Sequence, residues 1–463
     1  MVKSRQPQNG AFLDRSIPPL PANAQTMSFP PFQTRTLSNG LKIICVENHK
    51  LPIVTVNLVI RTGSAFDGLN SGLADMTANL LMKGTTKRNA EQIAEEVDFL
   101  GASLNTNAGW DASSISLTTL TKHLPALLEI MGDILLNPTF PEHEVKRLQA
   151  LTIADLVQAK ADVNYLASTR AAQALFGMHP YGNTATEQSI NAIDRRACRD
   201  FYEAGYAPDN SFVVVAGDAD INSLAGRFED LFTGWEKHSI RKRQFSEIQP
   251  IAERIVSIVA KPGAVQTSIR IGQEGVKRSD GDFLALDALN TIIGGYFNSR
   301  LNASLREKHG FTYGAHSRFD ARALGGCFVV SCDVRTEVTD KAIGEIFNEL
   351  HRIVIEPVTE EELTLMKNYV SGRFPLMIET PQHTANLLQN IELYGLPENY
   401  YSTLGERVRA LSSDNLMTVA KKHLHPDRMA IAVAGDASKI MEGMKQFGTV
   451  AVSDTDGNPV TST

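Results

Sequence analysis

Two pairs of segments in this chain repeat at almost the same spacing, and this duplication limits the folds that the chain can adopt. The segment VVVAGDAD (213–220) recurs as IAVAGDAS (431–438), 218 residues later. Likewise, LLNPTFPEHEVKRLQ (135–149) matches VIEPVTEEELTLMKN (354–368), 219 residues later. Because two independent segments agree on the offset, we expect two similar domains that follow one another along the chain.

Each half contains the same succession of expected elements. Apolar runs predict strands at 41–48, 53–63, 254–260 and 267–275. In each half a helix follows, then two strands and a long amphipathic helix, at 100–135 and at 313–354. Further helices lead to a last strand that ends in Ala-Gly-Asp. Strands grouped around helices, without regular β-α alternation, predict an α+β fold in which each domain is a mostly antiparallel sheet with helices packed on one face.

The polar stretches between these elements suggest the domain boundaries. The N-terminal segment is polar and proline-rich, and the segment 235–254 is hydrophilic. We therefore expect a flexible arm at 1–27, a first domain at 28–236, a linker at 237–252, a second domain at 253–450 and a flexible tail at 451–463.

Composition excludes several classes of function. The chain is 43% hydrophobic and 21% charged, with a formal net charge of −7, which argues against general binding to nucleic acid or anionic membranes. No apolar run approaches the ~18 residues that span a bilayer. The arm has no signal-peptide core, so we expect a soluble protein, either cytoplasmic or periplasmic after removal of a signal.

Several short motifs have an ordinary structural explanation. The four cysteines form no C-x-x-C pair and are expected to be buried free thiols (Cys45, Cys198, Cys327 and Cys332). HLH (423–425) falls at a helix end, HPY (179–181) is expected to form a turn, and the Gly294-Gly295 pair is expected to allow close helix packing. The sequence contains no P-loop and no G-x-S-x-G.

The segment SGLADMTANLLMKGT (71–85) predicts an amphipathic helix. Its apolar residues share one face at helical spacing (Leu73, Met76, Thr77, Leu80 and Leu81). Asp75, Ala78 and Asn79 lie on the opposite face, at the spacing that an H-x-x-E-H type of zinc helix gives to its ligands and general base. None of the residue types that such a site requires is present.

Many consecutive segments resemble the pitrilysin/insulinase family of zinc metallopeptidases, which also includes the subunits of the mitochondrial processing peptidase. The segments include TLSNGLKIICVENHKLPIVTVNLVIRTGSAFD, GLADMTANLLMKGT, LGASLNTNAGWD, LLNPTFPEHEV, ALFGMHPYGN, FNSRLNASLREKHGFTYGAHS and the two Ala-Gly-Asp strands. The resemblance covers nearly the whole chain in order. It implies one half of a clamshell, in which two such halves enclose a chamber that admits peptides.

The resemblance implies that the zinc site of catalytic members has been lost here. Aligned through GLA and LLMKGT, Asp75 and Asn79 stand at the histidine positions and Ala78 at the glutamate position. The window that supplies a distal glutamate in the family contains Asp155 instead (151–158). Asn is a poor zinc ligand and Ala cannot accept a proton from water, so we expect no metal on this chain. The alternative is that these residues bind a hard cation.

The second half keeps another family signature, the segment LREKHGFTYG with Arg306 and Tyr313. Arg306 is expected in the last turn of a helix, with Gly310 in the left-handed conformation after it and Tyr313 at the start of a strand. The resemblance implies that this pair faces a zinc site across the chamber, holds substrate and stabilises the oxyanion. The structural alternative is that Arg306 stabilises the helix end and Tyr313 is an ordinary strand residue.

A second candidate region is the strand that pairs with extended substrate in catalytic members of the family. Its counterpart consists of Ser103, Leu104, Asn105, Thr106, Asn107 and Ala108. With the zinc residues absent, core packing explains this strand equally well.

These observations predict a non-catalytic, substrate-binding subunit of a heterodimeric zinc peptidase. Its homologous partner would carry H-x-x-E-H and the Zn²⁺, while this chain would close the chamber over peptide substrates and supply Arg306 and Tyr313. By itself it would be inactive. The alternatives are a structural or assembly subunit and an inert homodimer that binds peptides.

Overall fold

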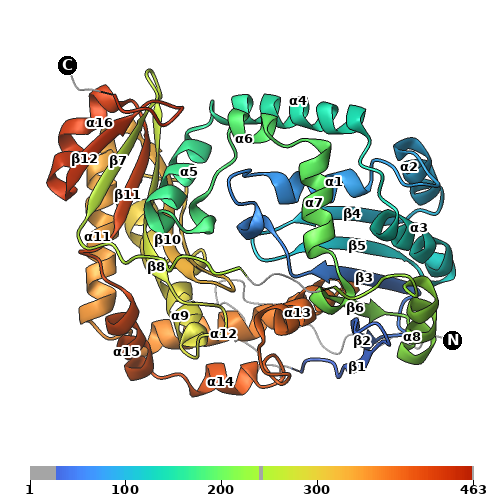
Figure 1. The fold of residues 1–463 in the computed structure, drawn as a ribbon. Helices are drawn as coiled ribbons and strands as arrows, with labels where there is room; N and C mark the ends of the chain where they lie inside the picture. The colour runs from blue at the N-terminus through green and yellow to red at the C-terminus, as the bar shows by residue number, and fades with distance from the viewer. Residues whose placement is uncertain (1–27, 239–242, 461–463) are drawn as a thin grey trace, which may run out of the picture.

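A computed structural model describes residues 28–238 and 243–460 of the 463-residue chain. Two six-stranded sheets stand side by side in the molecule (Figure 1), one from each half of the chain. The expected arm at 1–27 lies outside the described residues. No helix within the described ranges is long and apolar enough to cross a membrane.

The first sheet has the strand order β1-β2-β6-β3-β5-β4. Its strands are β1 (Gln33–Thr36), β2 (Lys42–Glu47), β3 (Ile53–Ile60), β4 (Ser103–Ala108), β5 (Ser113–Leu120) and β6 (Ser211–Gly217). Neighbouring strands are antiparallel except for β2 and β6, which run parallel. The helices of this half are α1 (Leu73–Leu81), α2 (Ala90–Phe99), α3 (Leu124–Leu136), α4 (Glu142–Ala159), α5 (Val163–Phe176), α6 (Glu187–Asn191), α7 (Arg195–Gly205) and α8 (Ile221–Leu231).

The second sheet repeats this arrangement in the order β12-β7-β11-β8-β10-β9. Its strands are β7 (Ile255–Ala260), β8 (Gln266–Gly275), β9 (Ala315–Ala321), β10 (Gly326–Arg335), β11 (Ala430–Gly435) and β12 (Thr449–Ser453). Its helices are α9 (Phe283–Asn290), α10 (Arg300–Asn302), α11 (Thr339–Ile355), α12 (Glu360–Met377), α13 (Pro381–Tyr394), α14 (Leu404–Ala410), α15 (Ser413–His423) and α16 (Ala437–Met444). Two π-helical segments, Thr291–Gly295 and Ala303–Lys308, flank α10.

The predicted α+β class and duplication are confirmed, and the two sheets differ mainly in their outer strand. In the first sheet the outer strand, β1, precedes the other strands along the chain and pairs antiparallel with β2. In the second sheet the outer strand, β12, follows them and pairs parallel with β7. Strand β12 reaches Ser453, so regular structure continues into the segment expected as a tail.

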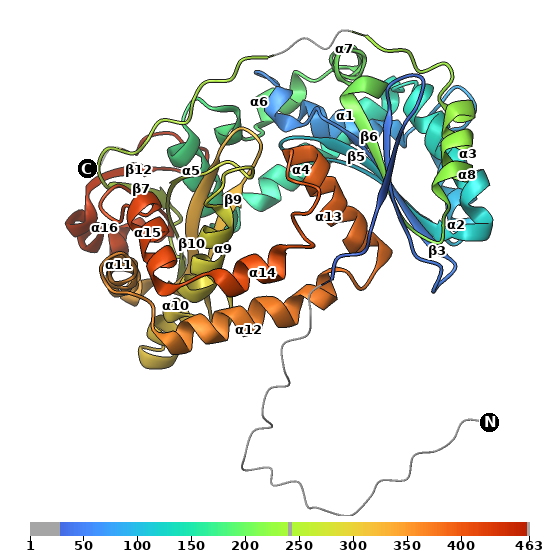
Figure 2. The ribbon, with the colours of Figure 1, turned by 90° about the horizontal axis from the view of Figure 1, so that it is seen from below.

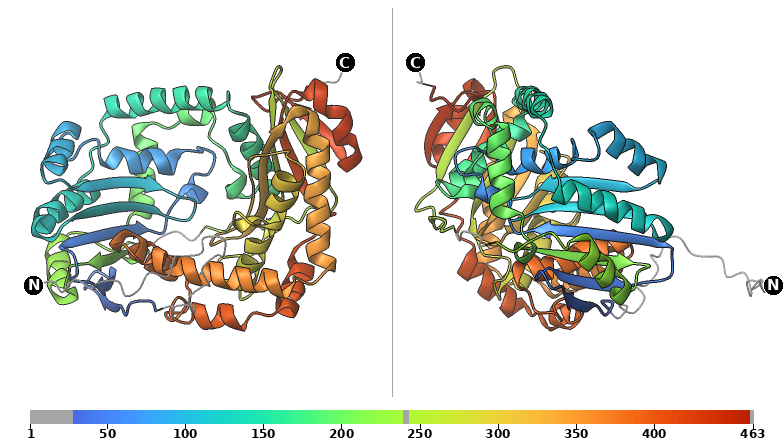
Figure 3. Two further views of the ribbon diagram at one scale, coloured as in Figure 1. Left: turned by 180° about the vertical axis from the view of Figure 1, so that it is seen from behind. Right: turned by 45° about the vertical axis from the view of Figure 1, so that its right-hand side comes forward.

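Each sheet is covered on its second face by a helix from the other half of the chain. Helix α13 packs on β3 and β6, and helix α5 packs on β8 and β11. Figure 2 shows α13, in red-orange, beside the first sheet and α5, in green, beside the second. In Figure 3 the preceding helices, α4 and α12, run along opposite edges of the molecule. The sequence predicted helices on one face of each sheet only, whereas helices cover both faces. The pattern of a helix shows that one side of it is buried, but it does not show which sheet buries that side.

Alternation along β6 explains why both faces of the first sheet need a cover. Val213 and Val215 belong to the core beneath helices such as α3 and α8, whereas Phe212 and Val214 belong to the cluster that includes Leu388 of α13. All five side chains are buried. Full burial of an aliphatic side chain stabilises a fold by roughly 1.5–3 kcal/mol, so separating α13 from this sheet would be costly.

Polar contacts hold the exchanged helices in register. Glu392 of α13 accepts a 2.6 Å hydrogen bond from Arg61 and lies 2.7 Å from Lys42 Nζ. On the other side, Asn164 of α5 accepts hydrogen bonds from Ser268 at 3.1 Å and from Arg270 at 2.9 Å. These groups are partly buried. Their pairing gives the charged side chains hydrogen-bond partners, which offsets the cost of removing those charges from water.

A third contact joins the tips of two hairpins, one from each domain. The buried Tyr181 hydroxyl donates a hydrogen bond to Asp111, between β4 and β5, and accepts one from Leu324 N–H at 3.1 Å, between β9 and β10. The other carboxylate oxygen of Asp111 accepts from Ala323 N–H at 3.1 Å. Burial and the Asp111 charge raise the pKa of Tyr181, so the hydroxyl keeps its proton. We call Asp111, Tyr181, Ala323 and Leu324 the hairpin latch.

We expect Tyr181→Phe to lower the free energy of unfolding by about 1–3 kcal/mol, because Asp111 loses a donor and Leu324 loses an acceptor. The amides of Ala323 and Leu324 should exchange with solvent faster, as hydrogen-exchange mass spectrometry would measure. Tyr165→Phe is the matched control, since the Tyr165 hydroxyl makes no hydrogen bond within the described residues. Equal exchange at the β9–β10 tip in both variants would contradict the latch.

Candidate functional site

Helix α1 forms where the sequence predicts it, and its apolar face is buried. Leu73, Met76, Leu80 and Leu81 are all below 10% exposed. Ala78, which helical spacing groups with the polar positions, is only 1% exposed. The helix packs against α7, β4, β5 and α4, so it is enclosed on more sides than a simple surface helix. Position 78 is therefore filled by a small buried methyl group.

The two polar positions of α1 interact with one another. The Asn79 side-chain nitrogen donates to the Asp75 carboxylate at 3.1 Å and to the Asp75 carbonyl at 2.9 Å. Partial desolvation raises the pKa of Asp75, and the bond from Asn79 opposes this shift. The third position, Asp155, lies on the exposed side of α4. The asparagine and the carboxylate thus pair with each other.

These residues do not fit zinc. A catalytic zinc site needs nitrogen, sulfur or carboxylate ligands around an open water position. Here Asn79 is an amide whose side-chain nitrogen donates a hydrogen bond to Asp75, and residue 78 is an alanine. Among the described residues, no three His, Cys, Asp or Glu side chains are arranged to hold a metal ion.

The start of α1 is held by Asp67, a residue that sequence reasoning missed. Its carboxylate accepts hydrogen bonds from Gly72 N–H at 2.7 Å and Ala74 N–H at 2.8 Å. Gly72 has φ of 103°, the left-handed region that favours glycine. Burial raises the pKa of Asp67 to about 6, although the backbone bonds oppose the shift. An aspartate six residues before the first residue of a helix was the available signal for this role.

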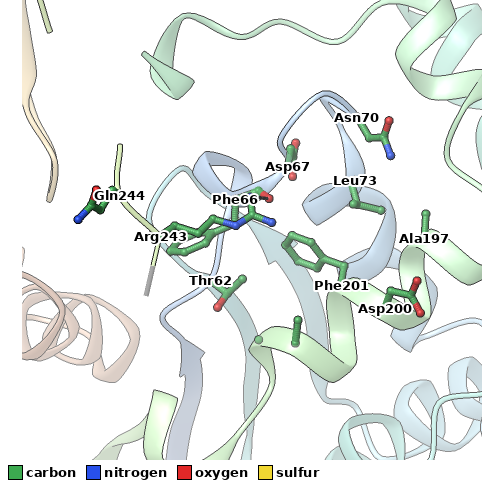
Figure 4. A pocket seen from close by; sticks show the side chains of 12 residues that line it. Thr62, Phe66, Asp67, Asn70, Leu73, Ala197, Asp200, Phe201, Arg243 and Gln244 are labelled. Carbon is green, nitrogen blue, oxygen red and sulfur yellow. Dashed lines mark hydrogen bonds between the residues drawn. The ribbon is translucent and has the colours of Figure 1, made fainter. Parts of the chain in front are cut away.

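A hollow of about 840 Å³ opens beside this helix start. Phe66, Phe201 and Leu73 form much of its wall, and Asp67 lies at its edge (Figure 4). The Arg243 side chain enters from the linker and donates a 2.5 Å hydrogen bond to the Phe66 carbonyl. The linker thus closes one side of the hollow, and the Asp67 carboxylate is already used to hold the helix.

The loop after α1 is held by the buried Asp133 of α3. This carboxylate accepts hydrogen bonds from Thr85 Oγ1 at 2.7 Å, Arg88 at 2.8 Å and Asn137 at 3.0 Å. Burial by itself would raise the pKa of Asp133, but these three donors outweigh it and hold the pKa below its ordinary value. The segment LLMKGT (80–85) therefore ends in a loop that side-chain hydrogen bonds hold in place.

We expect Asp133→Ala to lower the free energy of unfolding by about 3 kcal/mol at pH 7, because Arg88 loses a buried partner. A lowered folded pKa means that the carboxylate contributes stability above its unfolded pKa of about 4 and loses it as the pH falls through the folded pKa. The difference between wild type and variant should therefore be constant from pH 5 to 7 and smaller near pH 3.

Urea denaturation at these pH values measures the Asp133 effect. Asp230→Ala on α8 is the control, since Asp230 is exposed and should change stability by no more than about 0.5 kcal/mol. A difference for Asp133→Ala that does not depend on pH would contradict the charge-based role.

Strand β4, the candidate peptide-pairing strand, lies at the edge of the first sheet. It pairs with β5 only, so within the described residues its other edge has no strand partner. Ser103, Asn105 and Asn107 are exposed, whereas Leu104 is buried toward the core that includes α1. The strand therefore serves the core on one face and presents backbone groups along its free edge.

Arg306 lies near the end of the π-helical segment Ala303–Lys308, as the sequence predicted for a final helical turn. Gly310 follows with φ of 62°, which confirms the expected left-handed residue. The Arg306 guanidinium lies 4.3 Å from the centre of the Phe297 ring and 3.4 Å from Glu307. A cation–π contact of this kind contributes about 0.5–1 kcal/mol at an exposed site and fixes the orientation of the charge.

Tyr313 lies two residues before β9 and is 95% exposed. It therefore does not pack as an ordinary strand aromatic. Phe297, which sequence reasoning missed, is also exposed, at 62%. Both aromatic side chains are therefore open to solvent.

Buried asparagines hold the start of β9, two residues after Tyr313. Asn302 donates to the Ala315 carbonyl at 3.0 Å and accepts from the Ala315 N–H at 2.9 Å. Ser317 donates to Asn290 at 2.6 Å. These bonds tie the strand that follows Tyr313 to the helical segment that precedes Arg306. The loop between the two candidate residues is thus anchored at both ends.

The remaining motifs have structural roles. The four cysteines are buried and free, as expected. His423 of the HLH motif contacts Asp282 at 2.8 Å at the end of α15. A Cβ on Gly294 would lie 2.6 Å from Ser317 N, which explains the glycine by close packing. The HPY segment forms the expected turn, and its tyrosine also belongs to the hairpin latch.

Two family models match consecutive parts of the chain. Residues 42–187 match the insulinase model of peptidase family M16, and residues 192–370 match the peptidase M16 inactive domain. The non-peptidase homolog YmxG of Helicobacter pylori is 22% identical over 401 residues, which cover 86% of this chain and 92% of that protein. An uncharacterized zinc protease of Mycobacterium leprae is 25% identical over 412 residues, which cover 87% and 92%.

Solved structures share the same fold. A peptidase M16 inactive domain from Pseudomonas fluorescens superposes with a TM-score of 0.82 at 25% identity, covering 87% of this chain and 98% of that one. A protease from Helicobacter pylori superposes with a TM-score of 0.83 at 19% identity, covering 88% and 99%. The fold is that of a two-domain chain of the M16 type. This protein belongs to the insulinase family, peptidase family M16.

Proposed function

We propose that this chain is the non-catalytic, substrate-binding subunit of a heterodimeric zinc peptidase. The observation that carries the proposal is a complementary pattern. The positions of the zinc helix hold Asp75, Ala78 and Asn79, while the family's Arg306 and Tyr313 are present, and Tyr313 is 95% exposed. Similarity to a non-peptidase homolog and to the inactive-domain model supports a chain without its own chemistry.

In this proposal Arg306 and Tyr313 act on substrate bound at the zinc site of a homologous partner that carries H-x-x-E-H. A phenol and a guanidinium are hydrogen-bond donors that can stabilise the oxygen of a carbonyl as it becomes negative. Arg306 is already oriented by Phe297, and the Tyr313 hydroxyl is free to meet a ligand. The partner supplies the metal, and this chain supplies donors and closes the chamber.

The free edge of β4 gives the proposal a second contact with substrate. An extended peptide can add to a sheet edge through backbone hydrogen bonds, which depend little on side-chain sequence. Ser103–Ala108 would act in this way, with Asn105 and Asn107 beside the bound peptide.

A structural or assembly subunit is the rival, and the exposed Tyr313 argues against it. Exposing the Tyr313 side chain without a ligand or partner gains no stability for the fold. Co-purification with a homologous chain that carries H-x-x-E-H would identify the partner. A neighbouring gene that encodes such a chain is the first candidate.

We expect the purified chain to bind no stoichiometric zinc and to cleave no peptide, because Asp75, Ala78 and Asn79 cannot complete a zinc site. Mixing it with the partner should produce peptide hydrolysis that a chelator removes. Metal analysis by mass spectrometry and a quenched-peptide assay, with and without the partner, measure both points. Zinc-dependent cleavage by the isolated chain would overturn the proposal.

In the reconstituted pair, Tyr313→Phe should lower kcat/KM by about 10²-fold or more, the effect of losing one oxyanion donor. Tyr165→Phe is the control, since it removes a tyrosine hydroxyl from a ring that packs beside Val259 and Ala434 rather than beside Phe297. Because Tyr313 is exposed, its loss should leave the thermal midpoint of unfolding unchanged. Equal kcat/KM for wild type and Tyr313→Phe would exclude the proposed role of this hydroxyl.

A further inference from the structure

A hollow of about 400 Å³ lies on the face of the second sheet that α5 covers. One wall is apolar and comes from the first half of the chain, through Ala171, Ala172 and Leu175 of α5. The opposite wall comes from β8, β9 and β10 and contains several cations. The exchange of α5 therefore creates this hollow, which neither half of the chain could form alone.

Strand register brings basic side chains from separate strands to this wall. On β9, His316, Arg318 and Asp320 alternate with buried Ala315, Ser317 and Phe319, so the first three share the face toward α5. His316 pairs with Ser331 of β10, and Ser331 pairs in turn with Arg270 of β8. Arg322 follows directly after β9. The lining thus contains three arginines and a histidine against one aspartate, in a chain of net charge −7.

Two of the three arginines already have partners. Arg322 donates to both oxygens of Asp320, at 3.1 and 2.5 Å, and its guanidinium lies 4.7 Å from the centre of the Tyr181 ring. Arg270 donates to Ser168 at 3.1 Å and to Asn164 at 2.9 Å. Both side chains are 13% exposed. Their positive charges contribute to the electrostatic potential of the hollow, but their side chains have little exposed surface left for a ligand.

Arg318 is the cation that remains available. It is exposed, and among the described residues no carboxylate lies within ion-pair distance of its guanidinium. Its cross-strand neighbour is Val329, which offers no charge. The Ser331 hydroxyl and the exposed His316 ring lie on the same strand face. A planar guanidinium with free donors, next to a hydroxyl and an apolar wall, fits a carboxylate attached to an apolar chain.

The hollow follows Tyr313 along the chain. Arg318 is five residues from Tyr313, roughly 16 Å along an extended strand at ~3.3 Å per residue. A peptide held at Tyr313 and extended along β9 would therefore place a group about five residues away over Arg318. An anionic group at that distance would meet the unpaired Arg318 guanidinium, which lines the hollow together with the apolar residues of α5.

We propose that this hollow binds a carboxylate of the peptide substrate through Arg318. The inference rests on the proposed peptide-binding function and assigns its substrate class, peptides that carry a negative charge several residues from the scissile bond. The carboxylate can belong to the C-terminus of the peptide or to an Asp or Glu side chain. Arg318 sets specificity, and the bond-breaking step does not involve it.

Three fluorescent peptides distinguish these sources. They have the same length and differ only at one interior position and at the C-terminus. The first has a free C-terminus and Gln at the interior position, the second has a C-terminal amide and Glu, and the third has a C-terminal amide and Gln. Fluorescence anisotropy measures their binding to the full isolated chain. We expect one of the first two to bind at least about 10-fold more tightly than the third, the effect of one charge-assisted contact.

Variants of Arg318 assign the effect to this residue. Arg318→Glu should remove the preference for the anionic peptide and change binding of the uncharged peptide less than about 2-fold. Arg318→Lys should keep part of the preference, because it keeps the charge but not the planar fork. Arg227→Glu is the control, with the same change of charge at an exposed position on α8. The uncharged peptide shows that each variant is folded.

Equal binding of the three peptides to wild type would overturn the inference. So would a preference that survives Arg318→Glu or that Arg227→Glu removes equally. The proposed function is tested separately, because peptide cleavage by the reconstituted pair does not require a charge preference. Cleavage of all three peptides at equal rates, with equal binding, would retain the heterodimer and exclude the carboxylate site.

Discussion

The reciprocal packing of α5 and α13 on the sheets of the opposite halves determines the rest of this structure. Each sheet has a second apolar face that must be buried. A helix from the opposite half of the chain packs on that face. The hydrogen bonds of Glu392 to Arg61 and of Asn164 to Arg270 fix the helices where they lie. The hairpin latch then joins the domains at another point. The two domains therefore behave as one packed body, since separating them would expose apolar surface from both sheets at once.

Helix α1 is stabilised by contacts that do not depend on its polar positions. Helix α1 has a buried apolar face, a capping carboxylate in Asp67 and a following loop held by Asp133. None of these contacts involves Asp75, Ala78 or Asn79. Asn79 bonds to Asp75 instead, and Ala78 fills a buried gap. By contrast, the Tyr313 side chain is almost fully exposed. Stability accounts for α1, whereas it does not account for the exposed Tyr313.

Much of the fold could be predicted because its signals are local and repeated. Apolar runs marked the strands, helical spacing marked α1, and the repeated Ala-Gly-Asp segment showed that the two halves share one plan. The left-handed Gly310 was also readable, since glycine after a helix is a local signal. The helix exchange was not readable, because α13 shows the same kind of apolar pattern whichever sheet it covers. The roles of Asp111 and Tyr181 depend on contacts that span 70 to 212 residues and leave no local pattern.

The sequence by itself determined which residues are available for chemistry. It showed that a zinc helix of the H-x-x-E-H type is absent and that Arg306 and Tyr313 are present, since residue identity requires no fold. Only the tertiary structure decided which of these groups are free to act. It buried Ala78, paired Asn79 with Asp75, oriented Arg306 on Phe297 and left Tyr313 and Arg318 exposed. Availability depends on burial and on the partners that each group meets, and those partners come from strands and helices far apart along the chain.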